Sequence, residues 1–169
     1  MENIDFENKQ YYRKLCMDRR LKLDKDEVFN KSKKIYENVI SLKEIKQASR
    51  IFCYLSSEEK NEVNTGAIIL WLLNNKKEVY IPKTDWKEKK IKIYNLPEYP
   101  LPPHKFVKKH GIMEPVNEYF TEYLKKDMDV LILPGTSGDV NGIRYGYGSG
   151  FFDRMLVSLS NSKYRFISI

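Results

Sequence analysis

Hydrophobic and polar positions along this chain follow the period of a helix in some stretches and the period of a strand in others. Residues 6–23 have helical spacing, and the acidic run at 24–27 supplies the capping pattern that begins a second helix. The spaced positions on one face of this second helix are Val28, Ser32, Ile35, Tyr36 and Val39. Residues 65–73 are apolar on every side, which predicts a helix buried in the core.

Short apolar runs predict the strands. They occupy residues 50–55, 78–81, 90–94, 130–133 and 164–169. Pro82 is expected to stop the second strand, alternation predicts that 90–94 is an edge strand, and the prolines within 97–109 predict a loop. Because strands alternate with helices, we expect an α/β fold, a three-layer αβα arrangement with a largely parallel central sheet, Rossmann-like. The chain has no internal repeat or linker, so residues 1–169 are expected to form a single domain.

Residues 130–156 combine a predicted strand, a glycine-rich turn and the start of a helix. This layout suits phosphate, because glycines let the backbone approach an anion and the helix N-terminus offers free N–H groups. Arg144 adds a forked cation, and Asp153 adds a carboxylate beside which Mg2+ could bind. The spacing is neither that of a P-loop nor that of a dinucleotide-binding fingerprint. On composition alone, a surface turn with a helix cap is an equal alternative.

The full string resembles the signature of the 5-formyltetrahydrofolate cyclo-ligase family. The matching residues are Pro134-Gly135, Asp139, Gly142, Arg144, Gly146, Gly148, Gly150 and Phe151-Phe152-Asp153-Arg154. The departures from the family pattern are Thr136-Ser137-Gly138, Tyr145 and the pair Phe151-Phe152, which stands where the family has two tyrosines. Ser149 also occupies a position where some relatives carry a lysine, so one phosphate contact is expected to be missing.

Two further segments resemble the same family. Residues 9–14 match its opening basic helix, and Lys9, Arg13 and Arg20 fall within about 40° of each other on one helix face. Such a stripe suits a polyphosphate, although a solvated basic face is the alternative. In the segment 54–65, the resemblance implies that Glu62 contacts the folate pterin; the alternative is an acid at a helix N-terminus. Residues 111–115 also match a Gly-x-x-Glu-Pro segment, for which a turn is the default interpretation.

The resemblance implies an ATP-dependent ring closure of 5-formyltetrahydrofolate to 5,10-methenyltetrahydrofolate, which releases ADP and phosphate. Arg144 and Arg13 are the implied catalytic cations, and Asp153 is the implied Mg2+ ligand. The implied ATP contacts are Lys9, Gln10, Tyr11, Tyr12, Arg13, Arg144, Tyr145, Gly146, Tyr147, Gly148, Ser149, Gly150, Phe151 and Phe152. The implied folate contacts are Leu55, Glu62, Tyr147, Gly148, Ser149, Gly150 and Phe151. Since 54–62 and 134–150 both follow strand ends, they are expected to share one cleft.

The net charge of +7 suits anionic partners, including polyglutamylated folates. The lysines are spread along the chain and no RNA-binding motif is present, which argues against binding of nucleic acid. The sequence has no run of about 18 apolar residues, so no membrane span is expected. Cys16 and Cys53 are isolated, so neither a disulfide framework nor a zinc site is expected. His104 and His110 are expected to be solvent-exposed. We therefore expect a cytoplasmic protein, a monomer, that acts on a small-molecule reduced folate.

Two other functions remain open at this point. One is a protein that binds folate or a nucleotide without catalysing a reaction. Ser149 favours this alternative, and so does the expectation that the chain is short at its C-terminus. Relatives continue beyond the strand 164–169 and carry a second acidic residue there. The other is a related α/β enzyme that acts on a different phosphorylated metabolite, such as a sugar phosphate. Tyr54 and Glu62 count against a sugar, because a stacking face and a carboxylate suit a flat heterocycle.

Overall fold

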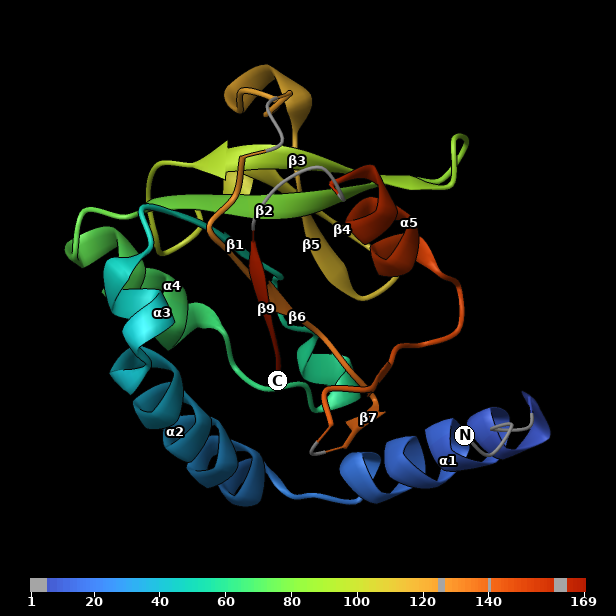
Figure 1. The fold of residues 1–169 in the computed structure, drawn as a ribbon. Helices are drawn as coiled ribbons and strands as arrows, with labels where there is room; N and C mark the ends of the chain where they lie inside the picture. Colours follow the sequence, from blue (N-terminus) through green and yellow to red (C-terminus); the bar gives the residue numbers. More distant parts are fainter. Residues whose placement is uncertain (1–5, 125–126, 140, 160–163) are drawn as a thin grey trace.

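The computed structural model describes residues 6–124, 127–139, 141–159 and 164–169. Its centre is a five-stranded sheet in the order β3-β2-β1-β6-β9 (Figure 1). The strands are β1 (Arg50–Cys53), β2 (Glu78–Asp85), β3 (Lys90–Leu96), β6 (Val130–Leu133) and β9 (Arg165–Ser168). β1 pairs in parallel with both β2 and β6, β6 pairs in parallel with β9, and β3 is antiparallel at one edge. The prediction of a largely parallel sheet is therefore confirmed.

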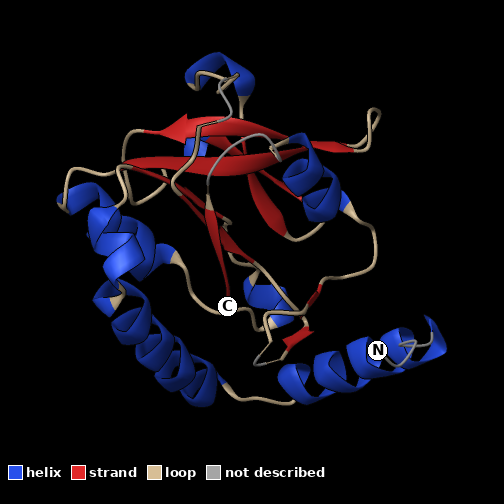
Figure 2. Cartoon of the chain, viewed as in Figure 1, coloured by secondary structure: helices blue, strands red, loops and turns tan. Residues whose placement is uncertain are grey.

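Helices cover both faces of this sheet, as Figure 2 shows. One face carries α2 (Lys25–Ser41), α3 (Lys43–Gln47) and α4 (Gly66–Asn74), and the other carries α5 (Phe151–Ser158). Side chains alternate along β1, so Ile51 packs toward the three helices while Phe52 packs with Met155 of α5. Burial on both faces explains why the strands read as continuous apolar runs, and it confirms the three-layer α/β fold.

The first helix, α1 (Phe6–Leu21), lies apart from the sheet beside a small hairpin of β7 (Ser137–Gly138) and β8 (Arg144–Tyr145) (Figure 1). The predicted start of α2 is confirmed, because Asp24 Oδ1 accepts from the Glu27 N–H over 2.8 Å and Glu27 Oε2 accepts from the Asp24 N–H over 3.1 Å. None of the helices in the described part of the chain is long and apolar enough to cross a lipid bilayer.

Three local predictions were wrong. β2 does not stop at Pro82 but continues to Asp85, because its pairing with β1 ends at Tyr80 and no strand on that side needs the N–H that proline lacks. The expected loop at 97–109 contains the 3-10 helix η2 (Pro103–Lys105) and the strand β4 (Phe106–Lys109). Helix α4 is not buried on every side, since the side chain of Leu70 is 42% exposed.

β4 pairs with β5 (Ile112–Pro115) in an antiparallel hairpin that contacts β2. His110 and Gly111 form its turn with φ of 50° and 76°, so the default of a turn at 111–115 holds only for its first residue. Two further 3-10 helices are η1 (Glu58–Lys60) and η3 (Asn117–Tyr119). The hairpin brings residues from the middle of the chain to the carboxyl ends of the parallel strands.

Candidate functional site

A cavity of about 210 Å³ opens at the carboxyl ends of the parallel strands. The segment after β1, the segment after β6, the glycine-rich loop and the two hairpins of β2–β3 and β4–β5 all contribute to its walls. The lining residues that were predicted as site residues are Arg13, Leu55, Glu62, Arg144, Gly146, Tyr147, Gly148, Ser149, Gly150, Phe151, Phe152 and Asp153. The structure thus brings together the two segments that were expected to share one cleft.

The glycine-rich loop turns sharply before α5. Gly148 and Gly150 have φ of 99° and 69°, a region that side chains with a Cβ rarely adopt, and Gly150 is the N-cap of the helix. From Tyr147 to Gly150, no backbone N–H donates a hydrogen bond to another residue that the structure describes. These N–H groups and the first turn of α5 are therefore available to an anion, as phosphate binding requires.

The basic stripe of α1 faces this loop. Arg13 Nε donates to the carbonyl of Gly146 over 2.9 Å, and Arg20 Nη1 donates to the carbonyl of Gly135 over 3.1 Å. Arg13 also lines the cavity, while Arg20 Nη2 donates to Tyr147 Oη over 2.5 Å. Arg13 and Arg20 thus both contact the 135–147 segment, as side chains on one helix face can, and their bonds to its carbonyl oxygens were not predicted.

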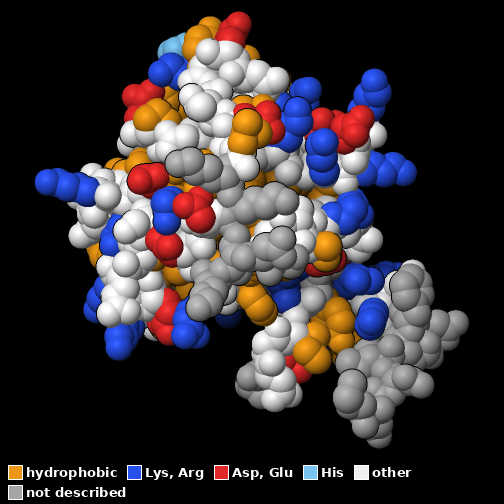
Figure 3. Space-filling model, turned by 45° about the horizontal axis from the view of Figure 1, so that its top comes forward, with side chains coloured by type: hydrophobic (Ala, Val, Ile, Leu, Met, Phe, Trp, Pro, Cys, Tyr) orange, Lys and Arg blue, Asp and Glu red, His pale blue; other side chains and the backbone are white. Residues whose placement is uncertain are grey.

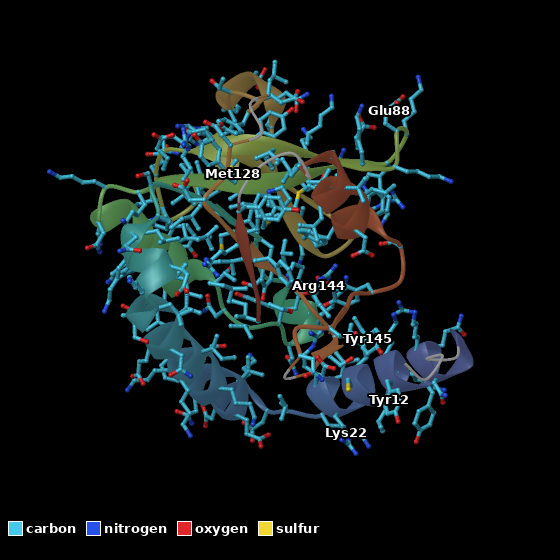
Figure 4. The ribbon with its side chains drawn as sticks, viewed as in Figure 1. Tyr12, Lys22, Glu88, Met128, Arg144 and Tyr145 are labelled. Carbon is cyan, nitrogen blue, oxygen red and sulfur yellow. The ribbon has the colours of Figure 1, made fainter. Side chains whose placement is uncertain are left out.

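The other predicted residues of α1 lie farther from the cavity. Gln10 lines a shallow groove between α1 and the loop, together with Arg13 and Gly148. Tyr11 and Tyr12 are 61% and 48% exposed and pack edge-to-face on each other, with Tyr12 labelled on the outer side of α1 in Figure 4. Lys9 is half-buried but lines neither the cavity nor the groove.

Arg144 and Asp153 form an ion pair, and both residues line the cavity. The side chain of Arg144 is 8% exposed and also donates from Nη1 to the carbonyl of Pro134 over 2.9 Å, whereas that of Asp153 is 67% exposed. The buried guanidinium is thereby fixed by two acceptors, and the carboxylate keeps one oxygen toward solvent. Tyr145, which follows Arg144 in β8, accepts from Thr136 with its carbonyl and does not line the cavity (Figure 4).

The described residues hold no group of three or more His, Cys, Asp and Glu side chains that could bind a metal ion. Mg2+ beside a nucleotide needs only one or two carboxylates, since phosphates and water supply the other ligands. Asp153 stands in the first turn of α5 next to the available N–H groups, with its second oxygen free of the Arg144 bond. A single carboxylate at this place fits Mg2+ that arrives with a polyphosphate.

Glu62 lines the cavity but is only 6% exposed, and both of its oxygens already accept hydrogen bonds. Oε2 accepts from the Ser57 N–H over 2.7 Å, and Oε1 accepts from the hydroxyl of Tyr147. Burial and the neighbouring Glu62 raise the pKa of Tyr147, so its phenol stays protonated and remains the donor of this bond. Glu62 therefore joins the segment after β1 to the glycine-rich loop.

Three aromatic rings form a wall of the cavity that was not predicted. The ring centroid of Trp86 lies 4.4 Å from that of His110 and 5.3 Å from that of Phe151, the second pair edge-to-face. Lys60 lies over the face of Tyr147, 4.7 Å from its centroid. Trp86 and His110 sit on two different hairpin turns, and only tertiary packing brings them together. The sequence offered one indication of this wall. Trp86 lies in a lysine-rich turn, where a large apolar ring is not expected unless it packs on another part of the chain.

The two phenylalanines that begin α5 have different surroundings. Phe151 belongs to the aromatic wall and also lies under the guanidinium of Arg154, whose Nη2 donates to the carbonyl of Ser149 over 3.0 Å. Phe152 packs edge-to-face on Phe52 of β1, at 6.3 Å between centroids. Both rings line the cavity, so the apolar faces remain where the family pattern has tyrosines.

Comparison with known proteins gives consistent results. A model of the 5-formyltetrahydrofolate cyclo-ligase family matches residues 5–169. The 5-formyltetrahydrofolate cyclo-ligase of Haemophilus influenzae is 31% identical over 134 residues, which cover 77% of this chain and 67% of that protein. The protein of the same name from Saccharomyces cerevisiae is 28% identical over 142 residues, with coverage of 78% and 67%. These alignments span about two thirds of the length of either relative.

The structure resembles a solved one. The NMR structure of 5,10-methenyltetrahydrofolate synthetase from Aquifex aeolicus superposes with a TM-score of 0.75 at 28% sequence identity. The match covers 95% of this chain and 76% of the Aquifex chain. The two structures therefore share their fold over most of this chain.

Proposed function

Because the chain belongs to the 5-formyltetrahydrofolate cyclo-ligase family, we propose that it catalyses the ATP-dependent cyclisation of 5-formyltetrahydrofolate to 5,10-methenyltetrahydrofolate. ADP and phosphate are the other products. One observation carries the proposal: residues 147–150, whose N–H groups bind no other described residue, line the same cavity as the aromatic wall. An anion-binding loop beside a stacking surface suits a reaction between a polyphosphate and a flat heterocycle.

In this reaction the formamide oxygen of the folate attacks the γ-phosphorus of ATP, and ADP leaves. The neighbouring exocyclic amine nitrogen then attacks the carbon of the activated formamide and loses its proton, and the ring closes as phosphate leaves. No protein nucleophile is required, so the contribution of the chain is positioning and charge neutralisation. Among the described residues, the arginine and lysine side chains that line the cavity are Arg13, Lys60 and Arg144. Arg13 binds the Gly146 carbonyl, and Lys60 lies over the ring of Tyr147.

The residues present fit the proposed ligands as follows. The loop N–H groups and Arg13 would hold the phosphates, with Gln10 in the adjoining groove. Asp153 would hold Mg2+, which supplies charge neutralisation on the phosphates when bound. The wall formed by Trp86, His110 and Phe151 would stack on the pterin. Contacts from Lys9, Tyr11 and Tyr12 to ATP require the nucleotide to extend along α1, and they remain predictions.

We further propose that the protein is a cytoplasmic monomer that accepts polyglutamylated folates. On the face drawn in Figure 3, lysine and arginine side chains are scattered among acidic ones and form no single band. A scattered positive charge favours small anions over a long polyanion such as nucleic acid. Light scattering coupled to gel filtration tests the monomer, and a comparison of KM for mono- and triglutamyl substrate tests the polyglutamate preference.

The activity is tested by adding 5-formyltetrahydrofolate, ATP and Mg2+ to the purified protein and following the absorbance of the methenyl product. We expect absorbance to rise only when all three are present, and an equal amount of ADP to form. A folded protein that binds both substrates without forming product would instead support the binding-protein alternative. Failure to bind 5-formyltetrahydrofolate, with ATP affinity retained, would favour a different phosphorylated metabolite.

A further inference from the structure

Glu114 of β5 has one carboxyl oxygen that the fold does not satisfy. Its side chain is 2% exposed, and Oε1 accepts a hydrogen bond from the Thr84 N–H over 3.0 Å. Oε2 is also buried, yet no described residue donates a hydrogen bond to it. A buried acceptor without a partner is destabilising, so its presence in a native fold calls for an explanation, such as a ligand that donates to it.

The side chain of Glu114 belongs to the wall of the cavity. Residues two apart on a strand share a face, and Ile112 and Glu114 both line the cavity, as does Thr84 of β2. The nearby cation of Lys83 is held elsewhere, since its Nζ donates to the carbonyl of Pro115 over 2.8 Å and to Asn117 Oδ1 over 2.6 Å. Glu114 therefore meets the cavity as an acceptor that has no protein cation bound to it.

The contrast with Glu62 assigns a role to this oxygen. Both glutamates line the same cavity, but Ser57 and Tyr147 already donate to the two oxygens of Glu62. Of these glutamate oxygens, only Oε2 of Glu114 lacks a donor among the described residues, and Glu114 lines the cavity together with Trp86 and Ile91. An acceptor beside a stacking surface suits a flat ring that carries N–H donors at its edge.

We infer that Glu114 is a substrate-binding residue whose Oε2 accepts a hydrogen bond from an N–H group of the pterin ring. The inference rests on the proposed function, because the ring N–H belongs to 5-formyltetrahydrofolate. This hydrogen bond would fix the orientation of the pterin ring in the cavity. The Thr84 N–H holds the carboxyl group of Glu114 in place through Oε1. The proposed function assigns the phosphates of ATP to the glycine-rich loop and Arg13, not to β5, so the contact from Glu114 is specific to the folate.

The test is the Glu114→Gln variant, studied by calorimetry with 5-formyltetrahydrofolate and, separately, with ATP and Mg2+. Glutamine keeps the volume and the acceptor for Thr84 but places an NH2 group where Oε2 lies, so two donors would face each other. We expect affinity for 5-formyltetrahydrofolate to fall at least tenfold and affinity for ATP to stay within twofold. Glu88→Gln, at the exposed tip of the β2–β3 hairpin (Figure 4), is the matched control and should bind both ligands like the parent.

The outcomes separate the two proposals. If the parent binds 5-formyltetrahydrofolate and folded Glu114→Gln binds it within twofold of the parent, the role of Glu114 is overturned and the proposed function stands. If the parent itself does not bind 5-formyltetrahydrofolate, both proposals fail. Should Glu114→Gln not fold, Glu114→Asp keeps the charge and withdraws the oxygen from the cavity. It is expected to show the same selective loss, and an unchanged folate affinity in that variant would overturn the assignment.

Discussion

Tyr147 donates a hydrogen bond to Glu62 across 85 residues of sequence, and this bond joins the two walls of the cavity. On one side, the Ser57 N–H fixes Glu62 at 2.7 Å; on the other, Arg20 reaches Tyr147 Oη at 2.5 Å. The loop, the segment after β1 and helix α1 are thus linked through one phenol. A change in this phenol should be felt both in stability and in substrate binding.

Tyr147→Phe removes this hydroxyl but keeps the ring that Lys60 covers. It leaves Oε1 of Glu62 without its donor, and we expect the free energy of unfolding in urea to fall by about 1–3 kcal/mol. Tyr12→Phe is the matched control, because that ring is exposed on α1, and it should leave stability unchanged. Equal stability of Tyr147→Phe and the parent would show that the bond is not maintained in solution.

The phenol of Tyr147 should titrate above the ordinary value of 10, because burial and then Glu62 raise its pKa. A raised pKa means that this group contributes stability below the unfolded pKa and loses it as pH rises through the folded one. The ultraviolet difference titration between the parent and Tyr147→Phe isolates this residue. We expect no ionisation of Tyr147 up to pH 10; a midpoint at or below 10 contradicts the prediction.

Gly148→Val should abolish ATP binding while the fold survives. A Cβ there would meet only the guanidinium of Arg13, at 3.9 Å, so the effect comes from the φ of 99° and from blocked backbone approach to phosphate. Gly142→Val is the control, since Gly142 also has a positive φ, of 85°, with nothing within 4 Å, but does not line the cavity. Calorimetry with ATP should separate the two; retained affinity in folded Gly148→Val would rule out this role for the loop.

Arg144→Ala and Arg13→Ala should each lose roughly 2–4 kcal/mol of transition-state stabilisation, or roughly 30- to 900-fold in kcat/KM. Both cations line the cavity, and each is held by a carbonyl of the loop region, from Pro134 or Gly146. Arg19→Ala, on the exposed side of α1, provides the control and should turn over like the parent. If both variants have the same kcat/KM as the parent, Arg144 and Arg13 have no catalytic role.

Asp153→Asn and Glu62→Gln should fail in different ways. Asp153→Asn keeps an acceptor for Arg144 but removes the charge, so we expect a higher Mg2+ concentration for half-maximal turnover. Glu62→Gln places an NH2 group against Tyr147 or Ser57, at a cost of roughly 1–3 kcal/mol. This weakens the link between the loop and the segment after β1, so we expect KM for the folate to rise. The test is to measure turnover of both variants as a function of Mg2+ concentration and of folate concentration. If the two variants show the same Mg2+ and folate dependences, Asp153 and Glu62 do not have separate roles.

The sequence predicted those parts of the fold that depend on local period. The runs at 50–55 and 130–133 read as buried strands because both faces are covered, and the family resemblance, confirmed by the family match, came from the fixed spacing in 134–154. The course of β2 past Pro82 could not be predicted, because it depends on where the neighbouring strand ends. The Trp86–His110 contact likewise arises between two turns that no periodicity relates.

The bond from Arg13 to the Gly146 carbonyl spans 133 residues, so the site can be complete only after both segments have been synthesised. During translation α1 leaves the ribosome long before the glycine-rich loop, and for that interval its arginines have no loop carbonyls to bind. The nucleotide therefore has no complete surface to recognise on the nascent chain. When the loop arrives, a ligand that binds only the assembled form draws the docking of α1 toward completion by mass action. A nucleotide that binds as proposed would therefore also stabilise the docked position of α1.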